Sequence, residues 1–146
     1  MKLLLIISAV FEALVGASLL VLPAFTTSTL LGVALDSPAG FVAARIGGAA
    51  LVALAIACWN ARDGERAGPA LGVVTAMLFY NFAALAVLVW AGIRLELRSP
   101  MLWPTIVLHL ALGVWCLISV RFSKRQTQKF ETVPAAGAKP DKCRYF

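Results

Sequence analysis

The sequence predicts an all-α membrane protein, a four-transmembrane-helix up-down-up-down bundle with a disordered basic C-terminal tail. The chain has 146 residues, of which 61% are hydrophobic and 14% are charged, and its mean hydropathy is +0.88. A soluble domain of this length cannot bury so much apolar surface in one core. Apolar runs of bilayer length recur along the first 121 residues, and the composition then becomes polar and basic.

Four apolar runs are long enough to cross a bilayer, which takes about 20 residues at about 1.5 Å per residue. Ser37-Pro38 and Ser99-Pro100 each place an N-cap hydroxyl before a proline at the first helical position. Adjacent runs with short connections are expected to pack as antiparallel neighbours. The predicted spans within domain 1–121 are residues 3–22, 38–59, 69–91 and 100–120.

The first run also has features of a cleaved signal peptide, because Lys2 precedes an apolar stretch. The stretch continues through "SLLVL", past the best small-residue site "VGA", and it contains an acid. We therefore expect a retained span. Residues 23–37, which begin with "PAFTTST", are too short to cross and are predicted to lie at the membrane interface.

Residues 122–146 are predicted to form a cytoplasmic tail that is disordered beyond about Thr132. The flank "RFSKRQTQK" at the start of this segment is expected to contact anionic lipid through its basic side chains. These side chains are Arg121, Lys124, Arg125 and Lys129.

The distribution of basic residues predicts that both termini are cytoplasmic, and the expected location of the chain is a cell inner (plasma) membrane. With four spans, the N-terminus, the middle loop and the tail share one side, and this side holds nearly all Lys and Arg outside the spans. The opposite side holds only Arg94 and Arg98. Because the basic residues do not gather on one face of a folded domain, nucleic acid is not expected as a partner.

Metal and cofactor chemistry has no signature in the chain. The three cysteines form no CxxC pair, and a single histidine supplies neither a Cys/His zinc site nor a bis-histidine haem. No HExxH, P-loop or nucleophile elbow is present. We expect no metal and no cofactor.

Each predicted span carries one polar residue near the middle of the bilayer. Counted from the cytoplasmic ends, Glu12, His109, Asn81 and Arg45 lie at depths of about 14 to 21 Å. Tyr80 adjoins Asn81. The predicted ligand-binding or structural polar cluster therefore comprises Glu12, Arg45, Tyr80, Asn81 and His109.

Glu12 and Arg45 are predicted to face each other across a close helix contact. An Arg at a helix centre costs about 2.5 to 3.5 kcal/mol, and the Ala- and Gly-rich second span offsets little of this cost. Glu12 lies on a stripe with Ser8 and Gly16, which favours close helix approach. The pair is either a structural ion pair or a ligand site, and alternatively Arg45 extends toward the outer surface.

The remaining polar residues also have two interpretations. Asn81 favours a hydrogen bond between helices over contact with a ligand. His109 has the chemistry of a proton relay, although a hydrogen-bonded core histidine is the simpler interpretation.

The segments "EALVGASLLVLPAF", "LLGVALDSPAGFVAARIGGAALVAL" and "WNAR" make the chain resemble small bacterial four-helix membrane proteins of the DoxX-like kind. The resemblance extends over about the first 120 residues and lies in the span layout, the proline after the first span and the Arg-Ile-Gly-Gly at the second. It implies an inner-membrane bundle without a common activity, and it assigns no catalytic residue.

Three functions follow from these patterns. The leading hypothesis is a non-enzymatic accessory or assembly protein that contacts another membrane protein. The alternative is a small-molecule or proton-handling membrane protein that uses the same cluster. A membrane enzyme acting on a lipid- or quinone-like substrate is the third. A dry bundle with Glu12 and Arg45 paired would favour the first, and a cavity lined by Glu12, Tyr80, Asn81 and His109 the second.

Overall fold

The computed structural model describes residues 1–63 and 67–131, with side chains over 1–63 and 69–123. This part of the chain is helical and contains no strand, which confirms the all-α prediction. The helices are α1 (Lys2–Val21), α2 (Pro23–Leu31), α3 (Pro38–Ala61), α4 (Ala67–Arg94) and α5 (Leu102–Glu131).

Four of these helices, α1, α3, α4 and α5, are long and apolar enough to cross a membrane. Large apolar side chains cover their outer faces, as a lipid-facing surface requires. The chain is thus a multi-pass membrane protein, with candidate spans at Lys2–Val21, Pro38–Ala61, Pro69–Arg94 and Leu102–Ser123. α5 begins two residues later than predicted and extends past residue 120 through the basic flank to Glu131. The predicted disorder beyond Thr132 lies outside the described residues.

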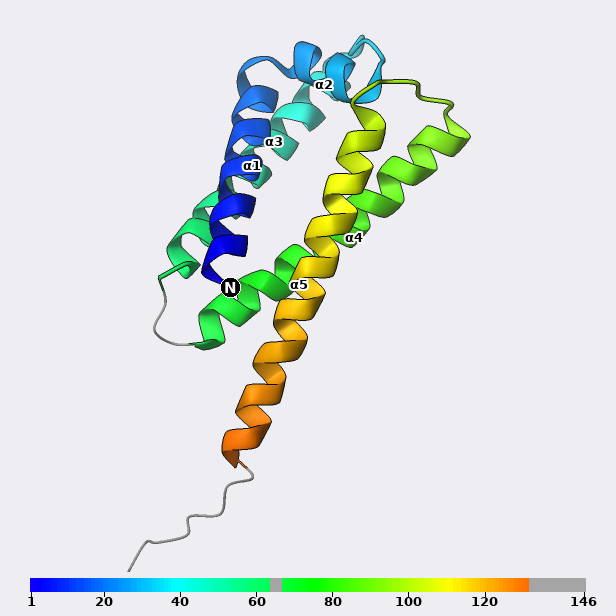
Figure 1. Cartoon of the computed structure of the whole chain (residues 1–146). Helices are drawn as coiled ribbons and strands as arrows, with labels where there is room; N and C mark the ends of the chain where they lie inside the picture. Colours follow the sequence, from blue (N-terminus) through cyan, green and yellow to red (C-terminus); the bar gives the residue numbers. More distant parts are fainter. Residues whose placement is uncertain (64–66, 132–146) are drawn as a thin grey trace, which may run out of the picture.

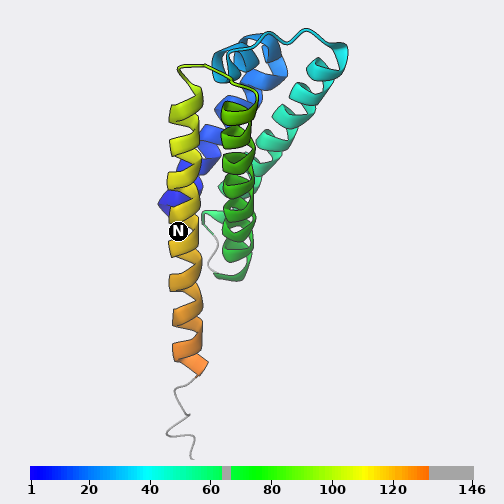
Figure 2. The same cartoon turned by 90° about the vertical axis from the view of Figure 1, so that its right-hand side faces the viewer.

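The long helices form two antiparallel pairs, α1 with α3 and α4 with α5. Figures 1 and 2 show the start of α1 and the later part of α5 toward one end of the bundle, and α2 at the opposite end. We call these the N-terminal end and the α2 end. Chain direction therefore alternates from span to span, as the up-down-up-down prediction requires.

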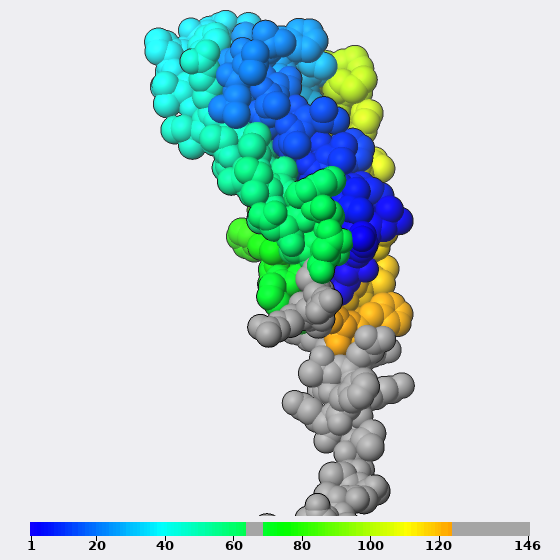
Figure 3. All heavy atoms as spheres, turned by 90° about the vertical axis from the view of Figure 1, so that its left-hand side faces the viewer, coloured from blue at the N-terminus to red at the C-terminus, as the bar shows by residue number. Residues whose placement is uncertain are grey.

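Two glycines allow α1 and α3 to approach each other closely. A Cβ added to Gly16 would lie 2.8 Å from the carbonyl oxygen of Gly48, and one added to Gly48 would lie 2.7 Å from the carbonyl oxygen of Gly16. Any larger residue at either position would push the backbones apart. Figure 3 shows α1 and α3 lying against each other along this face of the molecule.

A hydrophobic core cluster closes the N-terminal end, and it draws residues from all four spans. Leu4 and Leu5 of α1 belong to this cluster together with Val74 and Met77 of α4, and each is at most 1% exposed. The remaining members are Ala9, Cys58, Ala70, Leu112, Cys116 and Val120. Both cysteines are free thiols buried in this cluster.

The short helix α2 is fixed at the opposite end by hydroxyl groups. The Ser18 and Thr26 hydroxyls are hydrogen-bonded to each other, and the Ser99 hydroxyl donates to the Thr29 carbonyl at 2.6 Å. α2 ends at Gly32, whose φ of +75° is a left-handed conformation that favours glycine. α2 therefore covers the last residues of α1 and the first residues of α5.

An ionic clamp joins the first residues to the end of α3. Lys2 Nζ lies 2.7 Å and Arg62 Nε 3.1 Å from the Asp63 carboxylate. The Lys2 hydrogen bond, followed by the charges of Arg62 and Lys2, lowers the pKa of Asp63 below its ordinary value of 3.8.

The glycine contact predicts different effects at two neighbouring positions of α3. Gly48→Ala is expected to lower the free energy of unfolding by about 1 to 3 kcal/mol, because the new methyl group overpacks the contact. Gly47→Ala is the control, since its Cβ would have nothing within 4 Å, and a helical Gly→Ala change is otherwise slightly stabilising. Unfolding in a denaturing detergent series measures both, and equal behaviour of the two variants would contradict the contact.

The ionic clamp predicts a pH-dependent effect. Because the folded pKa of Asp63 is lowered, its stabilising effect is complete above pH 3.8 and is lost as the pH falls through the folded pKa. Asp63→Asn is expected to lower the melting temperature at pH 7 and to match the parent in strong acid. The control Asp36→Asn removes an exposed carboxylate with no ion pair among the described residues, and a gap that persists in acid would contradict the clamp.

Candidate functional site

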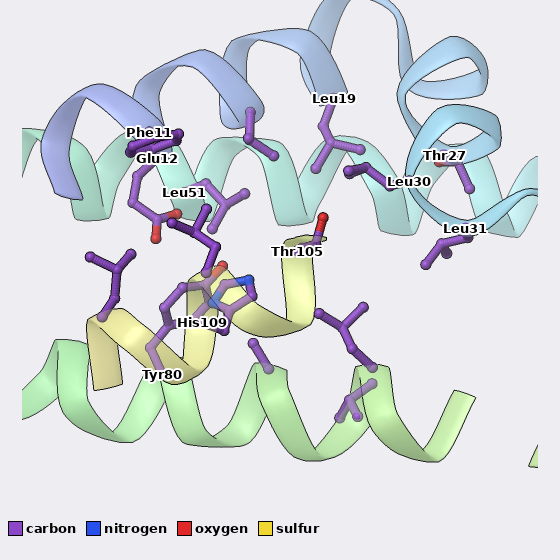
Figure 4. Close-up of a pocket in the computed structure, with 16 residues that line it drawn as sticks. Phe11, Glu12, Leu19, Thr27, Leu30, Leu31, Leu51, Tyr80, Thr105 and His109 are labelled. Carbon is purple, nitrogen blue, oxygen red and sulfur yellow. The ribbon is translucent and has the colours of Figure 1, made fainter. Parts of the chain in front are cut away.

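A cavity of about 450 Å³ lies between the two helix pairs and extends toward α2. Its walls are mostly Leu, Val, Ala and Phe side chains, with contributions from all five helices. Five polar side chains line it: Glu12, Thr27, Tyr80, Thr105 and His109. Figure 4 shows Glu12 projecting from α1 toward the side chains of Tyr80 and His109 on the facing helices.

Glu12 is buried, with 5% of its surface exposed, although it lies on a cavity wall. Tyr80 on the facing helix α4 is its polar neighbour, and the phenol hydroxyl is the group there that can donate to the carboxylate. Leu51 and Val15 lie nearby on the same wall. The acid therefore lies in mainly apolar surroundings, where a hydrogen bond offsets only part of the cost of a charge.

Asn81 and His109 join α4 to α5. Asn81 is 0% exposed, and its Nδ2 donates to the Met77 carbonyl at 2.8 Å. This bond directs the amide oxygen to His109 Nδ1, 3.0 Å away. An amide oxygen only accepts hydrogen bonds, so Nδ1 must carry a proton. In neutral His109 the other nitrogen, Nε2, is then an acceptor.

The Tyr80 and His109 rings also contact each other. Their centroids are 5.7 Å apart and their planes meet at 75°, an edge-to-face arrangement that aromatic pairs favour. Tyr80 and Asn81 are consecutive residues of α4. Tyr80 faces Glu12 of α1, and Asn81 is hydrogen-bonded to His109 of α5. Glu12, Tyr80, Asn81 and His109 thus form one polar group, which we call the polar end of the cavity.

The structure corrects one part of the predicted cluster, because Arg45 does not meet Glu12. Gly48 contacts Leu19 and Leu20, so Arg45 on the antiparallel helix lies level with the last residues of α1. That level is ten residues, or about 15 Å, from Glu12. Arg45 is exposed, and no ion pair joins the two residues in the described part of the chain.

Sequence reasoning considered a cavity lined by Glu12, Tyr80, Asn81 and His109 as one alternative, but it missed the extension of the cavity toward α2 and the polar groups there. Thr27 and Thr105 line the cavity, and Ser99, expected only as a helix cap, also bonds to α2. The hydroxyl-rich segment "TTST" was the available signal. In the basic flank, Arg121 is exposed, and the side chains of Lys124, Arg125 and Lys129 are outside the described ones.

Comparisons with known proteins found no match: no family model, no curated protein and no solved structure resembles the chain at a significant level. The resemblance to DoxX-like proteins therefore stays an expectation. Among the described residues, no three His, Cys, Asp or Glu side chains are grouped as metal ligands.

The Asn81 contact predicts the tautomer of His109, the single histidine of the chain. In ¹⁵N-histidine-labelled protein at a pH where the ring is neutral, we expect one imidazole signal set with the proton on Nδ1. Asn81→Leu removes the acceptor at similar volume, so we expect the tautomers to mix and the free energy of unfolding to fall by about 1 to 3 kcal/mol. A parent spectrum with the proton on Nε2 would contradict the arrangement.

Proposed function

We propose that this protein binds a lipid-soluble small molecule in the cavity between its two helix pairs. The supporting observation is the cavity itself, whose volume of about 450 Å³ falls within the range of small-molecule sites. Its apolar walls with a few convergent polar side chains are also typical of such sites. The occupant would be taken from the bilayer, which the outer faces of all four spans contact.

This proposal develops the small-molecule alternative of the sequence analysis. The structural interpretation depended on mutual pairing of Glu12 and Arg45, and the observed register separates these residues. Glu12, Tyr80 and His109 instead face a cavity, and Asn81 holds His109 in place. An accessory or assembly role stays a prediction, and no contact among the described residues favours it.

The proposal is one of binding without a chemical reaction. A membrane enzyme acting on a lipid- or quinone-like substrate stays a prediction, and no nucleophile or metal motif in the sequence favours it over binding. The positive-inside rule supports an orientation with both termini in the cytoplasm, and the resemblance to DoxX-like proteins is the basis for proposing a bacterial inner membrane. In that orientation α2 and the Thr-rich side of the cavity lie toward the periplasm.

A bulky residue in the cavity is expected to abolish binding. Ala84 of α4 lines the cavity, so Ala84→Phe would fill part of it. Ala86, two residues further along α4, is exposed and does not line it, so Ala86→Phe is a matched control. The probe is decanol, measured by equilibrium dialysis against the protein in phosphatidylcholine nanodiscs, with empty nanodiscs as the blank.

We expect the parent and Ala86→Phe to bind decanol above the blank with affinities within about twofold of each other, and Ala84→Phe to bind at least about tenfold more weakly, a difference of about 1.4 kcal/mol. Thermal melts of all three proteins establish that they are folded. Binding no greater than the empty-nanodisc blank for the parent, or equal binding by both Phe variants, would refute the cavity as a binding site.

A further inference from the structure

The polar end of the cavity holds hydrogen-bond acceptors whose protein donors are already engaged. Asn81 fixes the proton of His109 on Nδ1, and that proton is donated to the Asn81 amide oxygen. His109 lines the cavity, so its Nε2 is left as an acceptor there. A ligand that meets this nitrogen must bring the donor.

The second acceptor is the Glu12 carboxylate. Its two oxygens offer about four acceptor positions, and the neighbouring Tyr80 hydroxyl can fill only one of them. With that bond made, the Tyr80 proton is engaged, and the Thr105 hydroxyl donates to the Met101 carbonyl at 2.7 Å. Apart from Thr27, which belongs to α2, the cavity-lining polar side chains have committed their donors within the protein.

No described cation compensates Glu12. The ion pairs of the described residues, Lys2 with Asp63 and Arg62 with Asp63, lie at the N-terminal end of the bundle. Arg45 is exposed at the level where α1 ends. A buried carboxylate without a positive partner is costly in apolar surroundings, and a cation that donates hydrogen bonds removes most of this cost.

We propose that the cavity binds a lipophilic primary amine in its ammonium form. The ammonium N–H groups donate to the Glu12 carboxylate and to His109 Nε2, and the positive charge supplies the missing counter-ion. The apolar body lies along Leu19, Leu30 and Leu88 toward α2. The inference rests on the proposed function and adds the chemical class of the ligand.

The dimensions of the cavity suit such a molecule. Glu12 and Leu19 line the same wall and are seven residues apart on α1, which is about 10 Å along the helix. A linear alkyl chain fits this length with its head at Glu12. The Thr27 hydroxyl lies at the far end, where it accepts a second polar group if the ligand has one.

The test compares probes that share one alkyl chain and differ in the head group: decylamine, decanol and decanoate. At pH 7 the amine, like a Lys side chain, is an ammonium ion. Binding is measured in phosphatidylcholine nanodiscs, which carry no net charge, with empty nanodiscs as the blank. We expect decylamine to bind the parent at least about tenfold more tightly than decanol, and decanoate most weakly, because its charge is repelled by Glu12.

Glu12→Gln is expected to lower the ratio of decylamine affinity to decanol affinity from at least about tenfold to about one, because the amide keeps the size of the side chain but carries no charge. Asp63→Asn is the charge-matched control outside the cavity, and it is expected to keep the full preference. The three-probe comparison in the unaltered protein remains decisive even if Glu12→Gln fails to fold.

The possible failures are distinguishable. Decanol binding without a preference for decylamine, or a preference that persists in Glu12→Gln, overturns the amine assignment and leaves the proposed function standing. Binding of all three probes no greater than the blank overturns both. A preference that Asp63→Asn removes equally would show that net charge is responsible, and would also overturn the assignment.

Discussion

The close approach of α1 and α3 at Gly16 and Gly48 determines most of what the bundle can do. Backbone carbonyls take the space that side chains would otherwise occupy, so the two helices have a fixed register. That register puts Glu12 beside the facing helices α4 and α5 and leaves Arg45 at the level of the last residues of α1. The contact between these two glycines thus determines that Glu12, and not Arg45, lies beside α4 and α5.

The four-residue polar end shows how the two helix pairs differ in their roles. α1 brings the acid, whereas α4 and α5 bring a tyrosine and a histidine that are held by ring contact and by the Asn81 amide. The bond from Asn81 Nδ2 to the Met77 carbonyl fixes the orientation of the amide, so its oxygen always faces His109. The imidazole therefore cannot exchange its tautomer without losing a buried hydrogen bond. The α4–α5 pair is therefore a preorganised surface, and Glu12 completes it from the other side.

Candidate spans were predictable because bilayer thickness and helix rise together set a minimum length of about 20 residues, and each apolar run can be compared with that length. The same counting predicted similar depths for Glu12, Asn81 and His109, and the structure groups these residues with Tyr80. The separation of Arg45 from Glu12 was not predictable, since depth alone does not tell which way a residue points or how two antiparallel helices are aligned. The extension of the cavity toward α2 was also not predictable, because it depends on how the side chains of five helices pack around it.

The core cluster at the N-terminal end has a consequence for the membrane as a whole. Leu4, Leu5, Val74 and Met77 fill the space between the spans on one side of Glu12, whereas the cavity occupies the other side. Such a dry plug interrupts any file of water molecules through the bundle. A cell that maintains a voltage across its membrane can therefore keep an acid and a cavity within the bilayer and still preserve the membrane's electrical insulation.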